Sequence, residues 1–246
     1  MSHLMVENLS KSFGDHLVLD RLSLSVKEGE FVSILGPSGS GKSTIFHLIG
    51  GLEIPDSGTF YLNNEKINNK RGMISYMPQS PSLFPWRNIL DNVVLGAEIK
   101  EKPDYKKAKE MLMRAGLKGY ENAYPHELSG GMRQRVAFVR SLLSPQSFIC
   151  LDEPFSSLDE FTRLDMQKWL LSIWEQERQS VLFVTHNIEE AIFLSDRILV
   201  LSTNPATVQS EFKIHFERPR AESLLLTPEF LSLKKEIYLA LRGELM

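Results

Sequence analysis

The stretch that decides the fold reads Phe31-Val32-Ser33-Ile34-Leu35 and continues as Gly36-Pro37-Ser38-Gly39-Ser40-Gly41-Lys42-Ser43-Thr44. The apolar run 31–35 predicts a buried strand. The apolar residues that follow Thr44 recur at helical spacing and predict a helix that reaches Leu52. The segment 36–44 matches the pattern G-x-x-x-x-G-K-[ST] in the context that this pattern requires, between a strand and a helix. The sequence therefore predicts an α/β protein of the P-loop type.

The chemistry of this loop points to a nucleoside triphosphate. Its glycines allow backbone N–H groups to turn towards phosphate oxygens, and the helix N-terminus adds positive potential. We expect Lys42 to contact the outer phosphates and the hydroxyl of Ser43 to ligate Mg²⁺. A glycine-rich turn with an exposed lysine is the alternative, and the flanking strand and helix disfavour it.

A second functional element, which carries two acidic residues, lies further along the chain. The apolar run 148–151 predicts another buried strand, and Asp152 and Glu153 follow it directly. P-loop proteins hold Mg²⁺ with a carboxylate at the end of such a strand, so we assign Asp152 to the metal. Glu153 is placed to polarise an attacking water as a general base. An acidic turn without function is common by itself, and the upstream P-loop makes it the weaker interpretation.

Four further motifs indicate a family. Leu128-Ser129-Gly130-Gly131-Met132-Arg133-Gln134-Arg135 opens a helix that we expect over 131–143, and Gln79, Ser156-Ser157-Leu158-Asp159 and Thr185-His186 complete the set. In this order the motifs closely resemble those of the ATP-binding subunit of an ABC transporter, over about residues 6–201. The resemblance implies a P-loop NTPase (RecA-like) core with an N-terminal antiparallel β-subdomain and a helical insert. We expect one ABC ATPase domain over 1–246: a core from 1–79 and 147–204, a helical subdomain over 80–146 and a tail over 205–246.

The resemblance also implies roles for single residues that their spacing does not give. Phe13 matches the aromatic side chain that stacks on adenine, although an isolated phenylalanine is more often an ordinary apolar residue. Gln79 matches the Q-loop glutamine, which touches Mg²⁺ or the attacking water and senses the membrane partner. His186 matches the switch histidine, which reaches the γ-phosphate. The resemblance thus adds Gln79 and His186 to Glu153 as catalytic residues and makes ATP and Mg²⁺ the expected ligands.

Two motifs are implied to act across a dimer. Ser129, Gly130 and Gly131 match the signature that binds the γ-phosphate of ATP held by the other subunit, where a helix N-terminus again faces an anion. Ser129 is also an ordinary N-cap, and the two roles are compatible. Asp159 matches the D-loop aspartate at the dimer interface, and its alternative role is likewise an N-cap.

Some positions mark a branch of the family. Met132 stands where the signature usually has Gln, and Ser157 stands where Ala is common. With methionine at this position, and in the segment 83–86, the sequence resembles the importers of nitrate, sulfonate and taurine. Trp86 in that segment either lies at the surface that receives the membrane subunit's coupling helix or anchors the loop by packing.

Composition limits the remaining possibilities. The 28 Lys and Arg residues are nearly balanced by 31 Asp and Glu residues, which argues against a mainly electrostatic nucleic-acid binder, although a local basic patch is compatible with that balance. Cys150 is the single cysteine, so no internal disulfide is expected. The most apolar stretch, 191–202, contains Asp196 and Arg197 and is too short to span a bilayer. Composition thus predicts a cytosolic protein that crosses no membrane by itself, and the resemblance implies that it is peripheral, on the cytoplasmic face of the cell membrane.

The leading hypothesis is an ATPase subunit that imports a small solute. It implies a homodimer on ATP binding, an integral membrane permease as partner, indirect contact with a periplasmic or extracellular solute-binding protein, and no nucleic acid. A soluble ABC ATPase acting on nucleic acid or ribosomes is the alternative. Chromosome-maintenance and repair members of that kind place long coiled coils or zinc modules between P-loop and signature, and this interval has no heptads and no cysteine cluster. Translation-type members carry two ATPase cassettes in one chain, and only one is expected here. A P-loop kinase would leave Gln79, the signature and His186 unexplained.

Overall fold

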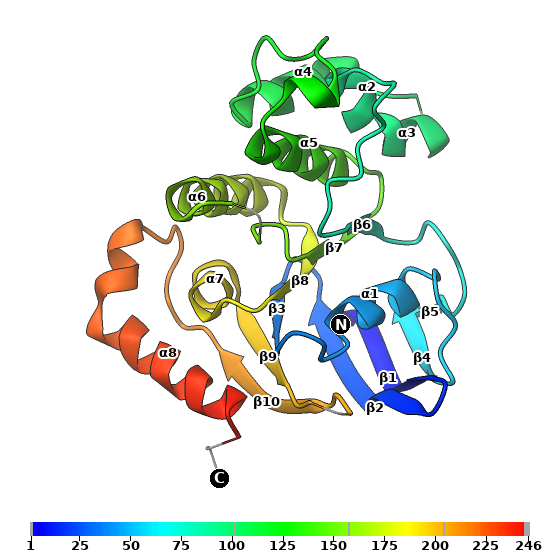
Figure 1. Ribbon diagram of the computed structural model, residues 1–246, viewed down its shortest axis with the longest axis vertical. Coiled ribbons are helices and arrows are strands. Elements are labelled where there is room, and N and C mark those ends of the chain that lie inside the picture. Colours follow the sequence, from blue (N-terminus) through cyan, green and yellow to red (C-terminus); the bar gives the residue numbers. More distant parts are fainter. Residues whose placement is uncertain (1, 101, 157, 204, 244–246) are drawn as a thin grey trace.

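A computed structural model describes residues 2–100, 102–156, 158–203 and 205–243. Ser157, which stands where Ala is common in the family, lies outside the described residues. Figure 1 shows two sheets packed together, with a group of helices above them. The smaller sheet is antiparallel and has the order β2-β1-β4-β5. Its strands are β1 (Ser2–Phe13), β2 (His16–Lys27), β4 (Ser57–Leu62) and β5 (Glu65–Lys66).

The larger sheet carries the strands that lead into the motifs. Its order is β10-β9-β3-β8-β7-β6, and all neighbours are parallel except β9 and β10. The strands are β3 (Phe31–Leu35), β6 (Ser75–Met77), β7 (Phe148–Asp152), β8 (Ser180–Thr185), β9 (Arg197–Leu201) and β10 (Val208–Lys213). Every residue of β3, β7 and β8 is buried, because parallel strands are covered on both faces.

Eight α-helices surround these sheets in the described part of the chain. They are α1 (Lys42–Ile49), α2 (Ile89–Val93), α3 (Leu95–Lys100), α4 (Tyr105–Arg114), α5 (Gly130–Leu142), α6 (Glu160–Glu177), α7 (Ile188–Leu194) and α8 (Pro228–Leu241). Helices α2–α5 form the upper group in Figure 1, and α6 lies between that group and the larger sheet. Short 3₁₀ turns cover Pro125–Glu127 and Glu222–Leu226.

The helical insert is packed onto the core through α6. Trp169 of α6 contacts the apolar clusters of both the core and the insert. Its ring meets Phe138 of α5 edge-on, with 6.0 Å between centroids. Edge-to-face aromatic pairs add to the stabilisation from burial, so this contact fixes how the signature helix rests on the core.

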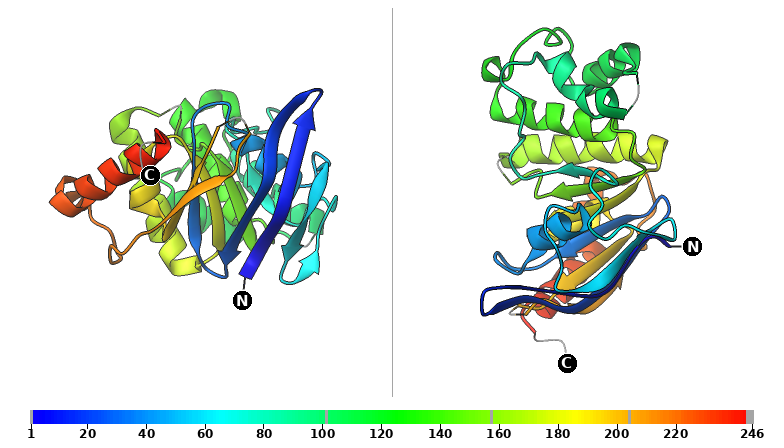
Figure 2. Two further views of the ribbon diagram at one scale, coloured as in Figure 1. Left: turned by 90° about the horizontal axis from the view of Figure 1, so that it is seen from below. Right: turned by 90° about the vertical axis from the view of Figure 1, so that its right-hand side faces the viewer.

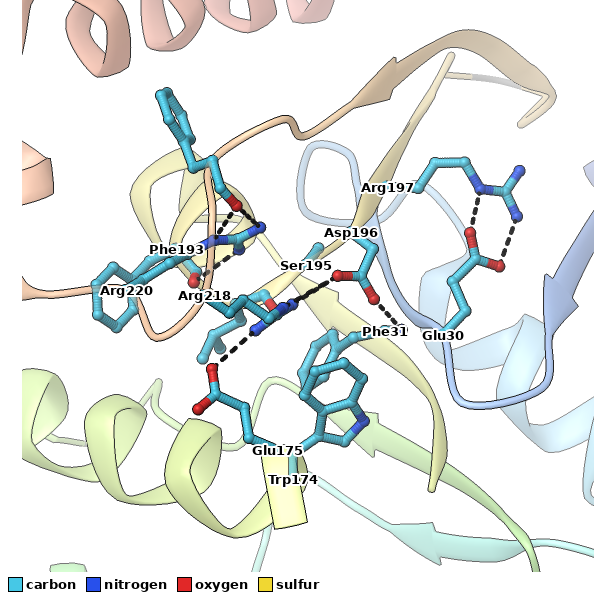
Figure 3. Close-up of polar contacts among 12 residues, drawn as sticks. Glu30, Phe31, Trp174, Glu175, Phe193, Ser195, Asp196, Arg197, Arg218 and Arg220 are labelled. Carbon is cyan, nitrogen blue, oxygen red and sulfur yellow. Dashed lines mark hydrogen bonds and ion pairs between the residues drawn. The ribbon is translucent and has the colours of Figure 1, made fainter. Parts of the chain in front are cut away.

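The C-terminal segment packs against α7 at the side of the larger sheet that is remote from β1, as Figure 2 shows for α8. Figure 3 shows two arginines of this segment at the C-terminal end of α7. Arg218 donates to the carbonyl of Leu194 at 2.7 Å, and Arg220 donates to the carbonyls of Ile192 and Phe193 at 2.9 Å each. Cations at this end complement the helix dipole. Burial lowers the pKa of Arg220 to about 10.

The expected fold class is confirmed, and the helix expected over 131–143 is found as α5, Gly130–Leu142. The first strand was missed. Its alternation of buried residues breaks between Val6 and Leu9, where Asn8 has a positive φ of 50° and the register shifts. Helices α2 and α3 were missed too, because five and six residues are too few for a helical period. The helix after the P-loop ends at Ile49 rather than Leu52, which is half exposed.

No helix in the described part of the chain combines the length and the apolar character that crossing a bilayer requires.

Candidate active site

The P-loop wraps around the N-terminus of α1. Gly41 caps this helix in the left-handed region, at φ 81°, and its carbonyl accepts from the N–H of Ile45 at 3.1 Å. A Cβ at this position would lie 2.7 Å from Cγ1 of Val18. Only glycine therefore satisfies both the backbone angle and the close approach of β2.

Lys42 is folded back into this loop. Its Nζ donates to the carbonyls of Gly36 and Pro37 at 2.8 Å each and lies 3.9 Å from Oε1 of Glu153. Burial lowers the pKa of Lys42, and the nearby Glu153 and Asp152 oppose that shift. The ammonium group is thus held inside the loop, next to two carboxylates.

Asp152 ends β7 with a buried carboxylate. Its Oδ2 accepts from the hydroxyl of Tyr76 at 3.2 Å, whereas Oδ1 is buried and has no hydrogen-bond partner among the described residues. Burial raises the pKa of Asp152, and the neighbouring Ser43 hydroxyl opposes the rise. Magnesium is commonly bound by one or two carboxylates together with substrate phosphates. The unpartnered oxygen beside the Ser43 hydroxyl fits such an ion.

Glu153 is the point on which the polar side chains converge. Its Oε2 lies 3.1 Å from Nδ1 of His186 and 3.4 Å from Nε2 of Gln79. The backbone of Glu153 has a φ of 43°, which a non-glycine residue rarely adopts. Its N–H donates to the carbonyl of Val184 at 3.0 Å, so the strained turn is tied to the neighbouring strand. Strained backbone of this kind clusters at functional sites.

Lys42, Gln79 and Glu153 line a pocket of about 470 Å³ next to the P-loop, whereas Asp152 and His186 are not among its lining residues. Phe13 lies at its rim, 48% exposed, with Nζ of Lys11 5.0 Å from its ring centroid. The lining residues are Phe13, His16, Val18, Ser38, Gly39, Gly41, Lys42, Ser43, Thr44, Gln79 and Glu153. His16 and Val18 were missed by the sequence reasoning. The turn Gly14-Asp15 was the available sign, because it brings β2 back beside Phe13.

The signature and D-loop residues lie elsewhere. Ser129 caps α5, its Oγ accepting from the N–H of Met132 at 3.3 Å, and Asp159 caps α6, its Oδ1 accepting from the N–H of Thr162 at 3.1 Å. Neither cap residue lines the pocket, and both are exposed. A Cβ on Gly131 would lie 3.4 Å from Leu158, so the two helix N-termini adjoin each other.

The site and fold can be compared with known proteins. Residues 19–156 match the family model described as ABC transporter. This chain belongs to the ABC transporter family. As an ATP-binding cassette of that family, it is an ATPase that uses ATP together with Mg²⁺.

Two curated relatives are similar over most of the cassette. The formylaminopyrimidine import ATP-binding protein ThiZ of Halalkalibacterium halodurans is 45% identical, over 89% of this chain and 88% of the relative. The nitrate import ATP-binding protein NrtD of a Synechocystis strain is 38% identical, over 98% and 96%. Among solved structures, a dimeric ATP-binding cassette bound to ADP and Pi in a post-hydrolysis state has a TM-score of 0.75 and 34% identity. That likeness covers 87% of this chain and all of the other.

Proposed function

We propose that this cassette hydrolyses ATP to drive the import of a small solute through a membrane permease. The observation that carries the proposal is the convergence of Lys42, Gln79 and His186 on Glu153 beside the buried Asp152. The import ATP-binding proteins named above support the direction of transport. We infer a solute of the nitrate, sulfonate or taurine class. No observation favours nucleic acid or ribosomes.

In this proposal, different residues of the site bind the nucleotide, supply positive charge and hold the metal ion. The loop 36–44 cradles the phosphates with backbone N–H groups, and Phe13 stacks on the base. Lys42 supplies a fixed positive charge to the outer phosphates. A magnesium ion held there would supply positive charge that offsets the negative charge of the phosphates. Asp152, Ser43 and Gln79 hold that ion in this proposal.

Glu153 acts as the general base. Its Oε2 would accept the proton of the attacking water, and Nδ1 of His186 at 3.1 Å is placed to orient the carboxylate and reach the γ-phosphate. Gln79, whose Nε2 lies 3.4 Å from Oε2 of Glu153, positions the water in this proposal. Proton removal by a well-placed base contributes roughly 10²–10⁴-fold to rate.

Two copies are proposed to close around ATP. Ser129, Gly130 and Asp159 are exposed helix-terminal residues that lie away from the pocket of their own chain. In the proposed dimer, residues 129–131 of each copy face the γ-phosphate held by the other, and Asp159 lies at the interface. The dimeric arrangement of the related cassette supports this assembly.

The permease is proposed to dock on the segment after Gln79. Trp86 is 71% exposed, and its ring stacks on Phe84 with centroids 5.0 Å apart, so the indole is presented outwards on an ordered loop. Exposed, preorganised tryptophans often anchor protein interfaces. The cassette is then peripheral, at the cytoplasmic face, and meets a solute-binding protein only indirectly.

Replacing Glu153 tests the proposal. Glu153→Gln should retain ATP binding, lower turnover by roughly 10²–10⁴-fold and accumulate as an ATP-bound dimer in size-exclusion chromatography. Glu229→Gln, which neutralises an exposed carboxylate on α8, is the matched control. Wild-type turnover by Glu153→Gln would refute the assignment of the base. Purification from membranes with a polytopic partner would support the permease, and purification with ribosomes or DNA would contradict it.

A further inference from the structure

Glu190 is a buried carboxylate that does not line the nucleotide pocket. It lies in the first turn of α7, and only 6% of the residue is exposed. The hydroxyl of Thr185 donates to its Oε2 at 2.6 Å, and the same hydroxyl accepts from the N–H of Asn187 at 3.0 Å. Glu190 therefore holds the turn from which His186 projects, on both sides of the histidine.

The same carboxylate contacts a second turn. Its Oε1 lies 3.6 Å from Nε of Arg163, in the first turn of α6. Arg163 in turn donates from Nη2 to the carbonyl of Leu158 at 2.8 Å. Leu158 directly precedes Asp159, the N-cap of α6. One ion pair between the buried Glu190 and the partly exposed Arg163 thus joins the Leu158–Asp159 turn to the Thr185–His186 turn.

The other ends of the same two helices are also tied together. Figure 3 shows Arg218 between them. Its guanidinium carbon lies 4.3 Å from the ring centroid of Trp174 in α6, and its Nη2 donates to the carbonyl of Leu194 at the end of α7. The two helices are thus in contact near both of their ends.

An apolar contact would serve packing equally well. Desolvation of the buried Glu190 carboxylate offsets much of what an ion pair contributes, so stability alone does not account for the pair. The hydrogen bonds from Thr185 to Glu190 and from Arg163 to Leu158 are directional, and the contact between the two charges connects them, so that position can pass from one turn to the other.

We propose that Glu190 is a positioning residue that couples the D-loop turn at Asp159 to the switch turn at His186 within one subunit. The inference rests on the proposed function, because it concerns the same hydrolytic site. A shift of Asp159 at the dimer interface would pass through Arg163 and Glu190 to His186. The spacing of His186 from Glu153 would change accordingly, so dimer contact and catalytic geometry are linked.

Steady-state kinetics test the coupling. Glu190→Gln keeps an acceptor for Thr185 and removes the ion pair, and it should lower kcat about tenfold while KM for ATP stays within about twofold. Glu189→Gln is the matched control, because Glu189 is the preceding residue of the same helix and pairs with Lys234. Its kcat should remain that of the wild type. An unchanged kcat in Glu190→Gln would overturn the inference.

A second variant separates coupling from general damage. Arg163→Gln removes the same ion pair from α6 and should give the same tenfold loss. Because the two residues act through each other, the double variant should be no slower than either single one. Multiplication of the two losses, to about a hundredfold, would contradict the proposal. If Glu190→Gln does not fold, the comparison of Arg163→Gln with the wild type decides.

A readout without ATP keeps this inference separate from the proposed function. Hydrogen–deuterium exchange should accelerate at residues 159–163 of α6 in Glu190→Gln, although the substitution lies in α7. Glu189→Gln should leave that exchange unchanged. A wild type without ATPase activity would refute the proposed function, and exchange would still decide the linkage. An active wild type with unchanged exchange in Glu190→Gln would refute the linkage alone.

Discussion

Arg218→Met should destabilise the protein strongly, because one guanidinium makes several contacts that methionine cannot. Its Nε and Nη2 donate to Oδ1 of Asp196 at 3.1 and 2.8 Å, and Nη2 also donates to Leu194 (Figure 3). Hydrogen bonds to charged groups contribute about 1.5–3 kcal/mol, and the cation–π contact with Trp174 adds about 1 kcal/mol. In the variant, Asp196 would still accept from the N–H of Phe31 at 2.9 Å, so its carboxylate keeps a partner and the loss of stability is limited. We expect a decrease of about 2–4 kcal/mol in the free energy of unfolding.

The assay is urea unfolding followed by circular dichroism, with the slope m compared between variants. Arg178→Met is the control, since Arg178 lies 4.8 Å from the same Trp174 ring and is exposed. It should cost about 0.5–1 kcal/mol, the range for an exposed cation–π contact. A cost for Arg218→Met no greater than that for Arg178→Met would refute the assigned role of the Asp196 and Leu194 contacts.

Two further perturbations probe the site and the smaller sheet. Burial and Asp152 raise the pKa of Tyr76 above its ordinary value of 10.0, so above about pH 10 the unfolded chain binds fewer protons than the folded one. Wild-type stability should therefore fall as pH rises past about 10. Thermal melts at about pH 9 and about pH 11 should show a smaller loss of stability for Tyr76→Phe than for the wild type. Gly58→Ala would place a Cβ 2.7 Å from Cα of Leu9 at a φ of 106°, and it should cost at least about 2 kcal/mol in urea unfolding. Gly14→Ala has φ 58° and open space, so it should cost only about 1 kcal/mol; equal costs would contradict the steric argument.

The nucleotide loop could be predicted because its functional residues follow one another in the sequence. Residues 36–44 carry the glycines, the lysine and the hydroxyl in one run, and the flanking apolar patterns identify the strand and the helix. Asp152 and Glu153 were accessible for the same reason, since they follow an unbroken apolar strand. Their roles remain predictions. Glu153 lines the nucleotide pocket beside Lys42, and Asp152 ends the strand directly before it without lining the pocket.

The supporting residues could not be predicted, because their partners are distant in sequence. Tyr76 meets Asp152 across 76 positions, and Arg218 reaches Asp196 across 22. A tyrosine in a short strand and an arginine in a tail have no periodicity that distinguishes them. Glu190 is one of two adjacent glutamates, and only the packing of α6 on α7 distinguishes the buried residue from the exposed one.

The site also depends on the order and the register of the strands, and no single motif specifies either of them. β3, β8 and β7 lie side by side, so the P-loop, the switch turn and the acidic turn leave the same edge of the sheet. Asp152 pairs with Val184, and this register places Glu153 one residue beyond the strand, level with the turn that carries His186. Because side chains alternate between the two faces of a strand, a slip of one residue would direct the Asp152 carboxylate to the opposite face. The 3.1 Å approach of Glu153 and His186 is therefore a consequence of the whole sheet, which the local sequence specifies only one strand at a time.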